Sequence, residues 1–203
     1  MFRLVCIVVG YFIGCIQMAF IVGKICKTDL SKKGSGNLGT TNALRVLGFK
    51  AGALTFIGDI LKAVVAFLLL QYIFAGEPLL AGIYAGAGVI LGHNFPFYLH
   101  FKGGKGIAAT IGMALCIGCT GYAPVMFVSY ILGLTAGALT QYISVGSMVF
   151  AVALPTSALF FHLPKEAVFI LAVLAVLALW QHRSNIGRLI AGNENKFTWK
   201  KKV

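Results

Sequence analysis

Acidic residues are scarce in this chain. Only five of its 203 residues are Asp or Glu, and charged residues of both signs make up 11%, whereas hydrophobic residues make up 59%. Soluble domains contain roughly 25% charged residues, so the composition excludes a soluble protein. The five acids are also scattered along the sequence, which excludes a carboxylate cluster of the kind that binds metal ions. We therefore expect no metal and no cofactor.

Long apolar runs take the place of the missing charge. A helix needs about 20 largely apolar residues to cross a bilayer, and several such stretches follow one another with short connections. The sequence predicts an all-α polytopic membrane protein with a single domain, residues 1–203. The first run, 2–22, lacks a small-x-small cleavage site, so we expect a retained helix and not a signal peptide.

The number of crossings depends on one segment. We expect helices at about 4–24, 50–74, 79–91 and 167–180, and the segment 107–164 between them contains no Asp, Glu, Lys or Arg. Breaks at 120–124 and 141–146 would divide that segment into three helices, giving seven in all. The glycine-rich stretch and the basic tail belong on the same face, so an even number of helices separates them; two very long tilted helices in place of four, giving five in all, are the alternative.

The basic residues are unevenly placed. The net charge of +12 would also fit a nucleic-acid-binding protein, but fourteen of the seventeen Lys and Arg fall in three segments, 24–50, 102–105 and 183–202. This bias is the positive-inside pattern of membrane proteins. It predicts that these segments and the C-terminus are cytoplasmic and that the N-terminus is outside, and it argues against nucleic acid as a partner.

A polar, glycine-rich stretch at 92–110 interrupts the apolar runs. Gly103, Gly104 and Gly106 can adopt backbone angles closed to other residues, so that successive N–H groups converge on one anion. Lys102 and Lys105 add positive charge, and a helix that begins at Ile107 would point its N-terminus at the loop. The pattern predicts a phosphate site. A loop whose lysines contact lipid headgroups is the alternative.

Polar side chains gather at other connections as well. Two of the candidate groups follow the first apolar run and the last one: Ser35, Asn37, Thr41, Asn42 and Arg45 in the first loop, and His182, Asn185 and Glu194 in the tail. Arginine offers a planar fork for phosphate. Caps of the following helix would explain part of the first group, and a tail that binds headgroups is the alternative for the second.

Other polar residues lie at or inside the apolar runs. His93 and Asn94 stand at the transition into the glycine-rich stretch, where they either bind substrate or end a helix. Asp59 and Lys62 share one face of a membrane helix, so they should pair or face the bundle interior. A structural ion pair and a wall of the site both remain open for these two. Glu194, the only acid of the tail, should be a structural partner for a cation or amide.

Several familiar motifs can be excluded. Gly34, Gly36 and Gly39 match the dinucleotide fingerprint, but no strand precedes them. There is no G-x-S-x-G nucleophile elbow, and no His is followed five residues later by Asp. Cys116 and Cys119 form a C-x-x-C inside an apolar run, where packing explains them better than zinc or redox chemistry.

Three segments together resemble a known family. They read S-G-N-L-G-T-T-N at 35–42, G-H-N-F-P-F-Y-L-H-F-K-G-G-K-G at 92–106 and H-R-S-N-I-G-R-L-I-A-G-N-E at 182–194. These segments, with D-I-L-K at 59–62, resemble the bacterial acyl-phosphate:glycerol-3-phosphate acyltransferase family (PlsY). Gln17 departs from that family's usual proline. The resemblance implies a monomeric enzyme of the bacterial inner membrane that acylates glycerol 3-phosphate at its 1-hydroxyl.

The resemblance also implies roles for the residues. Gly103, Gly104 and Gly106 bind glycerol 3-phosphate, whereas Ser35, Arg45 and Lys105 or Lys102 serve acyl phosphate and the charge of the transition state. His182 and Asn185 orient the attacking hydroxyl, and the proton goes either to His182 or to a substrate phosphate oxygen. A transporter for phosphate or an organic phosphate is the alternative function, and a non-catalytic lipid-binding subunit is a third.

Overall fold

The computed structural model describes residues 1–197, which form helices joined by turns and short loops and contain no strand. The helices fall into two compact units, residues 1–117 and the residues from Gly118 onward. The first unit contains α1 (Phe2–Gly14), α2 (Met18–Ile25), α3 (Thr40–Leu47), α4 (Phe49–Ile73), α5 (Pro78–Asn94), η1 (Phe97–Leu99) and α6 (Ile107–Ile117). The second contains η2 (Gly118–Tyr122), α7 (Ala123–Thr140), α8 (Ile143–Phe160), α9 (Lys165–Gln181) and α10 (Arg183–Ile190). Lys200, Lys201 and Lys202 of the basic tail lie outside the described residues.

The structure supports several membrane crossings but does not establish seven. Five stretches of the described chain are long and apolar enough to cross a bilayer, or six if the bent pair of α9 and α10 counts as one. The helices predicted at 50–74, 79–91 and 167–180 correspond to α4, α5 and α9. However, α6 has 11 residues, about 16 Å at 1.5 Å per residue, and this is short for a hydrocarbon core of about 30 Å.

The predicted breaks in the long apolar segment are confirmed. Thr120 and Gly121 have non-helical backbone angles, and the φ of +101° at Gly121 is one that glycine adopts readily. Gln141, with φ +61°, ends α7, and α8 begins two residues later. Two features were not expected: the first membrane helix is interrupted between α1 and α2, and the first loop contains the short helix α3.

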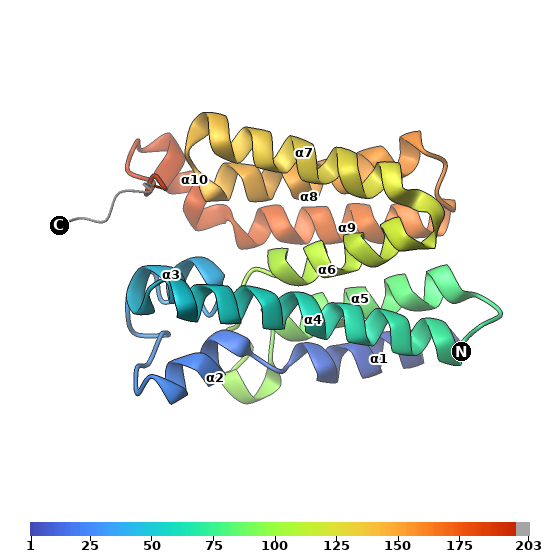
Figure 1. Cartoon of the computed structure of the whole chain (residues 1–203), viewed down its shortest axis with the longest axis horizontal. Helices are drawn as coiled ribbons and strands as arrows, with labels where there is room; N and C mark the ends of the chain where they lie inside the picture. The colour runs from blue at the N-terminus through green and yellow to red at the C-terminus, as the bar shows by residue number, and fades with distance from the viewer. Residues whose placement is uncertain (198–203) are drawn as a thin grey trace. The chain divides into compact units, whose positions relative to one another are not determined.

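Helix α5 is the centre of the first unit and packs against α1, α4 and α6 (Figure 1). A Cβ atom on Gly10 or Gly14 of α1 would clash with the α5 backbone, so these two glycines form a G-x-x-x-G face that allows close packing. Helix α5 contributes a second pair of glycines, Gly88 and Gly92, and a Cβ atom on either would clash with the α1 backbone. Because the two helices approach this closely, the interruption of α1 comes to lie against the end of α5.

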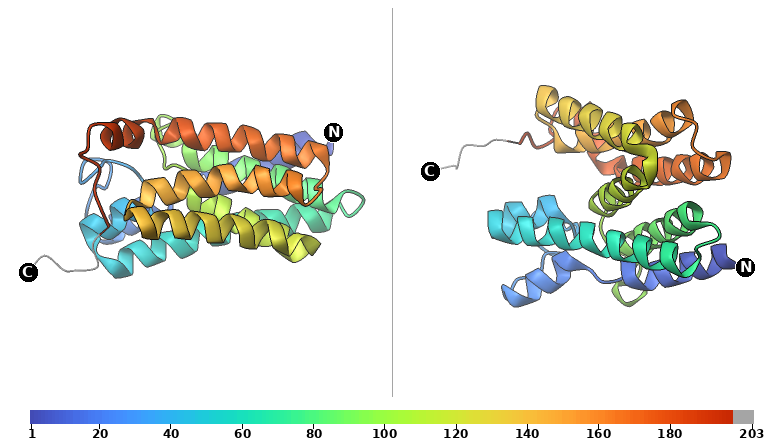
Figure 2. Two further views of the ribbon diagram at one scale, coloured as in Figure 1. Left: turned by 90° about the horizontal axis from the view of Figure 1, so that it is seen from above. Right: turned by 45° about the vertical axis from the view of Figure 1, so that its right-hand side comes forward.

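The second unit is a layer of three long helices, in which α8 contacts both α7 and α9 (Figure 2). Ser129 of α7 and Ser157 of α8 join their hydroxyl groups at 3.0 Å. At its end α9 bends by 54° into α10. This bend places His182 at the junction of the two helices.

We predict that Gly92→Ala destabilises the first unit. The added methyl group would clash with the Tyr11 carbonyl of α1, and overpacking of this kind typically costs about 1–3 kcal/mol. Thermal unfolding in detergent should show a lower midpoint. Gly76→Ala is the matched control, since a Cβ atom at Gly76 meets no atom within 4 Å; equal midpoints for the two variants would contradict the packing described for α1 and α5.

Candidate active site

The first loop is organised by Asn42. This side chain, 1% exposed, accepts a hydrogen bond from the Ser35 amide at 2.9 Å and donates to the carbonyls of Leu30 and Lys33 at 3.0 and 3.1 Å. Its polar atoms are therefore committed to the loop backbone. The predicted contact between Asn42 and substrate is corrected: the residue shapes the loop that carries its neighbours.

Two side chains of the first loop that could bind a ligand, Ser35 and Arg45, are exposed to solvent. Ser35 is exposed between Gly34 and Gly36, whose φ angles of +62° and +71° turn the chain on both sides of it. Arg45 is exposed in the last turn of α3, and no carboxylate within residues 1–197 pairs with its guanidinium group. Asn37 and Thr41 are partly buried. Ser35 and Arg45 are thus able to meet a ligand from solvent.

The glycine loop uses two of its amides internally. The N–H of Gly103 donates to the Asn94 carbonyl and that of Gly104 to the His93 carbonyl, both at 3.0 Å. A Cβ atom at either position would clash with His93. The prediction that these two N–H groups converge on an anion is therefore wrong. Glycine is needed at 103 and 104 because the loop lies directly on the end of α5.

The next residues have the features of an anion site. Gly106, with φ +82°, precedes α6, and the N–H groups in the first turn of a helix have no carbonyl acceptor within that helix. Lys105 is half-buried beside them and Lys102 is exposed. Asn94 is 2% exposed, and neither polar atom of its side chain has a hydrogen-bond partner among the described residues. Its Oδ1 lies 2.8 Å from the position of a Cβ on Gly106, so an unsatisfied amide borders this turn.

The first loop and the glycine loop are in contact. The Leu38 carbonyl oxygen lies 2.7 Å from the position of a Cβ on Gly104. The Leu38 side chain, 3% exposed, belongs to a small apolar cluster with Leu30 and Ala43, against which Leu99 packs. The fold therefore brings together two of the three segments that the sequence singles out.

Asp59, Lys62 and His93 form a buried cluster. The Lys62 Nζ lies 2.8 Å from the Asp59 carboxylate and 2.8 Å from His93 Nδ1. The predicted pairing of Asp59 with Lys62 is confirmed, and the Lys62 side chain is only 4% exposed. The structural ion pair, one of the two interpretations left open, is therefore formed. His93, 3% exposed, directs Nδ1 to this pair, which is not the arrangement of a residue that contacts substrate.

Gln17 is a residue of this region for which no role was predicted from the sequence. Its Nε2 donates to the His93 carbonyl at 2.9 Å and approaches the Gly92 carbonyl at 3.4 Å. Tyr98 similarly donates to the Cys15 carbonyl at 2.8 Å. A fully buried amide inside an apolar run was the available signal, since such a group needs a partner.

The third segment lies in the second unit. His182 is 3% exposed and its Nδ1 is 2.7 Å from the Ala178 carbonyl, an atom that only accepts. Nδ1 therefore carries the proton, and the neutral ring has its lone pair at Nε2. Asn185 donates to Glu194 at 2.7 Å. The orientation of His182 suits proton acceptance at Nε2.

Glu194 ties the tail to two helices. It pairs with Arg188 of α10 at 2.6 Å and accepts a hydrogen bond from Ser144 of α8 at 3.0 Å. Burial raises the pKa of Glu194, but hydrogen bonds from Asn185, Arg188 and Ser144 together outweigh it and hold the pKa below its ordinary value. Glu194 thus has both a cation and an amide as partners, as the sequence predicts.

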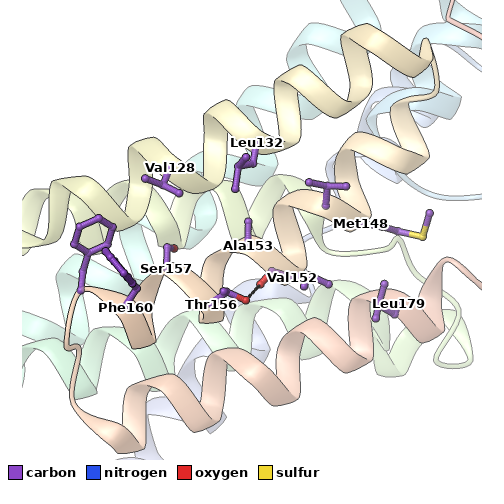
Figure 3. A pocket seen from close by; sticks show the side chains of 11 residues that line it. Val128, Leu132, Met148, Val152, Ala153, Thr156, Ser157, Phe160 and Leu179 are labelled. Atoms are coloured by element: carbon purple, nitrogen blue, oxygen red, sulfur yellow. Dashed lines mark hydrogen bonds between the residues drawn. The ribbon is translucent and has the colours of Figure 1, made fainter.

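An apolar cavity of about 650 Å³ lies in the second unit, against α7, α8 and α9 (Figure 3). The two hydroxyl groups of its lining donate to backbone carbonyls of their own helix, Thr156 to Val152 at 2.9 Å and Ser157 to Leu154 at 3.0 Å. The remaining lining is hydrocarbon and one thioether, as at Val128, Leu132 and Met148. Such a lining suits a hydrocarbon chain.

Apolar helices of spanning length, joined by loops that offer cations, helix N-termini and amides, define a multi-pass membrane protein equipped to bind phosphate groups. The family model described as glycerol-3-phosphate acyltransferase matches residues 4–192. The chain belongs to this family.

The chain is similar in sequence to individual relatives over nearly its full length. The glycerol-3-phosphate acyltransferase of Shouchella clausii is 41% identical and covers 92% of each chain, and that of Alkaliphilus metalliredigens is 43% identical and covers both chains fully. The crystal structure of PlsY (YgiH), an integral membrane glycerol 3-phosphate acyltransferase in its glycerol 3-phosphate form, superposes with a TM-score of 0.87 at 30% identity, covering 97% of this chain and 96% of that one. A lysophosphatidic acid form of the same enzyme gives 0.85.

We predict that Glu194→Gln loosens α10. Losing the carboxylate charge removes the ion pair with Arg188 and weakens the hold on Asn185, so amide hydrogen exchange should accelerate in residues 183–194. Because the folded pKa is depressed, the wild-type tie is present above the unfolded value, about 4.3, and is lost as pH falls through the folded pKa. Glu77→Gln, at an exposed turn, is the control; unchanged exchange in Glu194→Gln would argue against the tie.

Proposed function

We propose that the protein transfers a fatty acyl group from acyl phosphate to the 1-hydroxyl of glycerol 3-phosphate, forming 1-acylglycerol 3-phosphate and phosphate. The observation that carries the proposal is the contact between the first loop and the glycine loop, which gathers phosphate-binding chemistry at one end of the first unit. Family membership and the names of the relatives support the reaction, and the acyl phosphate donor rests on the resemblance of the three sequence segments.

Glycerol 3-phosphate is bound by the turn that leads into α6. Gly106 and the first amides of α6 face the phosphate, Lys105 supplies a positive charge, and the unsatisfied amide of Asn94 donates to an oxygen. Gly103 and Gly104 contribute by letting the loop lie on α5 and not through their own N–H groups. Asn37 and Thr41 border the same region from the first loop.

Acyl phosphate is bound by Ser35 and Arg45 together with Lys105 or Lys102. A mixed anhydride is already activated because phosphate is a good leaving group, so the protein has mainly to position the reactants and stabilise charge. The hydroxyl oxygen attacks the acyl carbon, the bond from that carbon to the bridging oxygen breaks, and phosphate leaves with the electron pair.

The hydroxyl proton goes to His182 in this mechanism. Its Nδ1–H bond to Ala178 leaves Nε2 as the acceptor, and Asn185 orients the same hydroxyl. We further propose one domain of seven crossings, a monomer in the bacterial inner membrane, with the N-terminus outside and the three polar segments cytoplasmic. The bias of basic residues supports this orientation.

We predict that Arg45→Ala and Lys105→Ala each lower kcat about 10²–10³-fold, the usual effect of removing one group that stabilises transition-state charge. Purified variants in detergent are assayed for lysophosphatidate from palmitoyl phosphate and labelled glycerol 3-phosphate. Lys50→Ala removes an exposed cation outside the site and should retain normal turnover. Ion flux in sealed vesicles without any product from the wild type would favour a transporter instead.

We predict that His182→Gln abolishes the fall in kcat on the acidic side of the pH–rate profile. That fall arises because a protonated imidazole cannot accept the hydroxyl proton. The residual rate of the variant should be low and independent of pH in that range. An acidic limb that persists unaltered would assign the proton to a substrate phosphate oxygen.

A further inference from the structure

The ammonium group of Lys62 is surrounded by acceptors from three different segments. The Asp59 carboxylate and the Ile16 carbonyl lie at 2.8 Å, the Gly14 carbonyl at 3.1 Å and His93 Nδ1 at 2.8 Å. Two of these acceptors are carbonyls at the interruption between α1 and α2, which have no partner within a helix. Lys62 therefore joins that interruption to α4 and to the end of α5.

This arrangement fixes the tautomer of His93. An ammonium group only donates, so the 2.8 Å contact requires a lone pair on Nδ1 and places the proton of the neutral ring on Nε2. The approach of Nδ1 to Asp59 is longer, at 3.4 Å. The cluster then holds one positive and one negative charge, which balance each other inside the bundle.

His93 transmits this arrangement to the glycine loop. The Nε2 edge of its ring lies against Gly104, where a Cβ atom would clash with it. Its carbonyl accepts hydrogen bonds from the Gly104 amide at 3.0 Å and from Gln17 at 2.9 Å. Both the side chain and the backbone of His93 thus determine where Gly104 lies, and Lys105 and Gly106 follow directly.

Stability alone does not account for such a cluster. Buried ion pairs can often be replaced by apolar residues without loss of stability, because desolvating the charges offsets much of their attraction. What an apolar replacement cannot supply is one point that orients three segments at once. The charged groups of Asp59 and Lys62 are also committed to each other, to His93 Nδ1 and to the carbonyls of Gly14 and Ile16.

We propose that Asp59, Lys62 and His93 are positioning residues, which set the glycine loop in its phosphate-binding position through His93 without touching substrate. The inference rests on the proposed function, because it names what holds the glycerol 3-phosphate site. According to this proposal, the cluster controls the affinity for glycerol 3-phosphate, and that effect can be measured separately from its effect on the stability of the bundle.

The test compares Lys62→Met with the double variant Asp59→Asn/Lys62→Met. The single variant leaves a buried carboxylate without its cation and should unfold at a lower temperature. The double variant removes both charges, so its unfolding midpoint should return close to wild type. Its KM for glycerol 3-phosphate should nevertheless stay raised by roughly 10- to 100-fold, since a displacement of about 1 Å can cost on the order of 10²-fold.

Two further variants keep the result interpretable. Thr55→Val changes a fully buried residue one turn away on α4, whose hydroxyl bonds only to the Ala51 carbonyl of its own helix, and should match wild type in both KM and midpoint. Lys62→Arg keeps the charge but not the compact ammonium, and should raise KM for glycerol 3-phosphate without a large loss of stability. If the double variant does not fold, Lys62→Arg is compared with wild type in the same two quantities, KM for glycerol 3-phosphate and the unfolding midpoint.

Hydrogen exchange gives a readout that does not depend on activity. The amides of Gly103 and Gly104 should exchange faster in the stable double variant than in wild type, with the α7–α9 segments unchanged. A double variant with normal stability, normal KM and normal protection of these amides overturns the proposal. Absence of lysophosphatidate from the wild type with the exchange result intact would instead reject the proposed function and leave the positioning role standing.

Discussion

The structure depends on one constraint: backbone groups at helix ends inside the bundle must find partners from the protein, because hydrocarbon offers none. The first membrane helix stops at Gly14 and resumes at Met18, and the carbonyls exposed there are met by Lys62 and Tyr98. The carbonyls in the last turn of α5 accept hydrogen bonds from Gln17 and from the amides of the glycine loop. The polar region therefore exists where two helices end against each other.

Close packing of α1 on α5 brings those ends together. Gly10 and Gly14 on one helix and Gly88 and Gly92 on the other let the backbones approach until no Cβ atom would fit. With larger residues the two helix ends would stand further apart, and Gln17 could not reach the His93 carbonyl. The small residues of the apolar runs, which carry no chemistry themselves, are in this sense part of the site.

Most of the helices and the grouping of polar residues could be predicted from the sequence, because the length of an apolar run and the distribution of basic residues can be read from it directly. It identified the pair of Asp59 and Lys62 from their spacing and the role of Glu194 from its isolation among cations. It did not reveal the interruption at 15–17, since Cys15 and Ile16 read as ordinary apolar residues. It also misplaced Asn42 and His93, because a polar side chain that holds a loop and one that binds a ligand look alike until their partners are known.

The glycines of the second segment show why spacing alone misleads. Gly103, Gly104 and Gly106 look equivalent in a nest, yet the first two are glycine because the loop lies on His93, and only Gly106 has a positive φ. An N–H already bonded to a carbonyl at 3.0 Å cannot also be a strong donor to phosphate. In the proposed site, phosphate is therefore bound by the groups beyond them, Lys105 and the start of α6, whose position depends on the buried contacts beneath the loop.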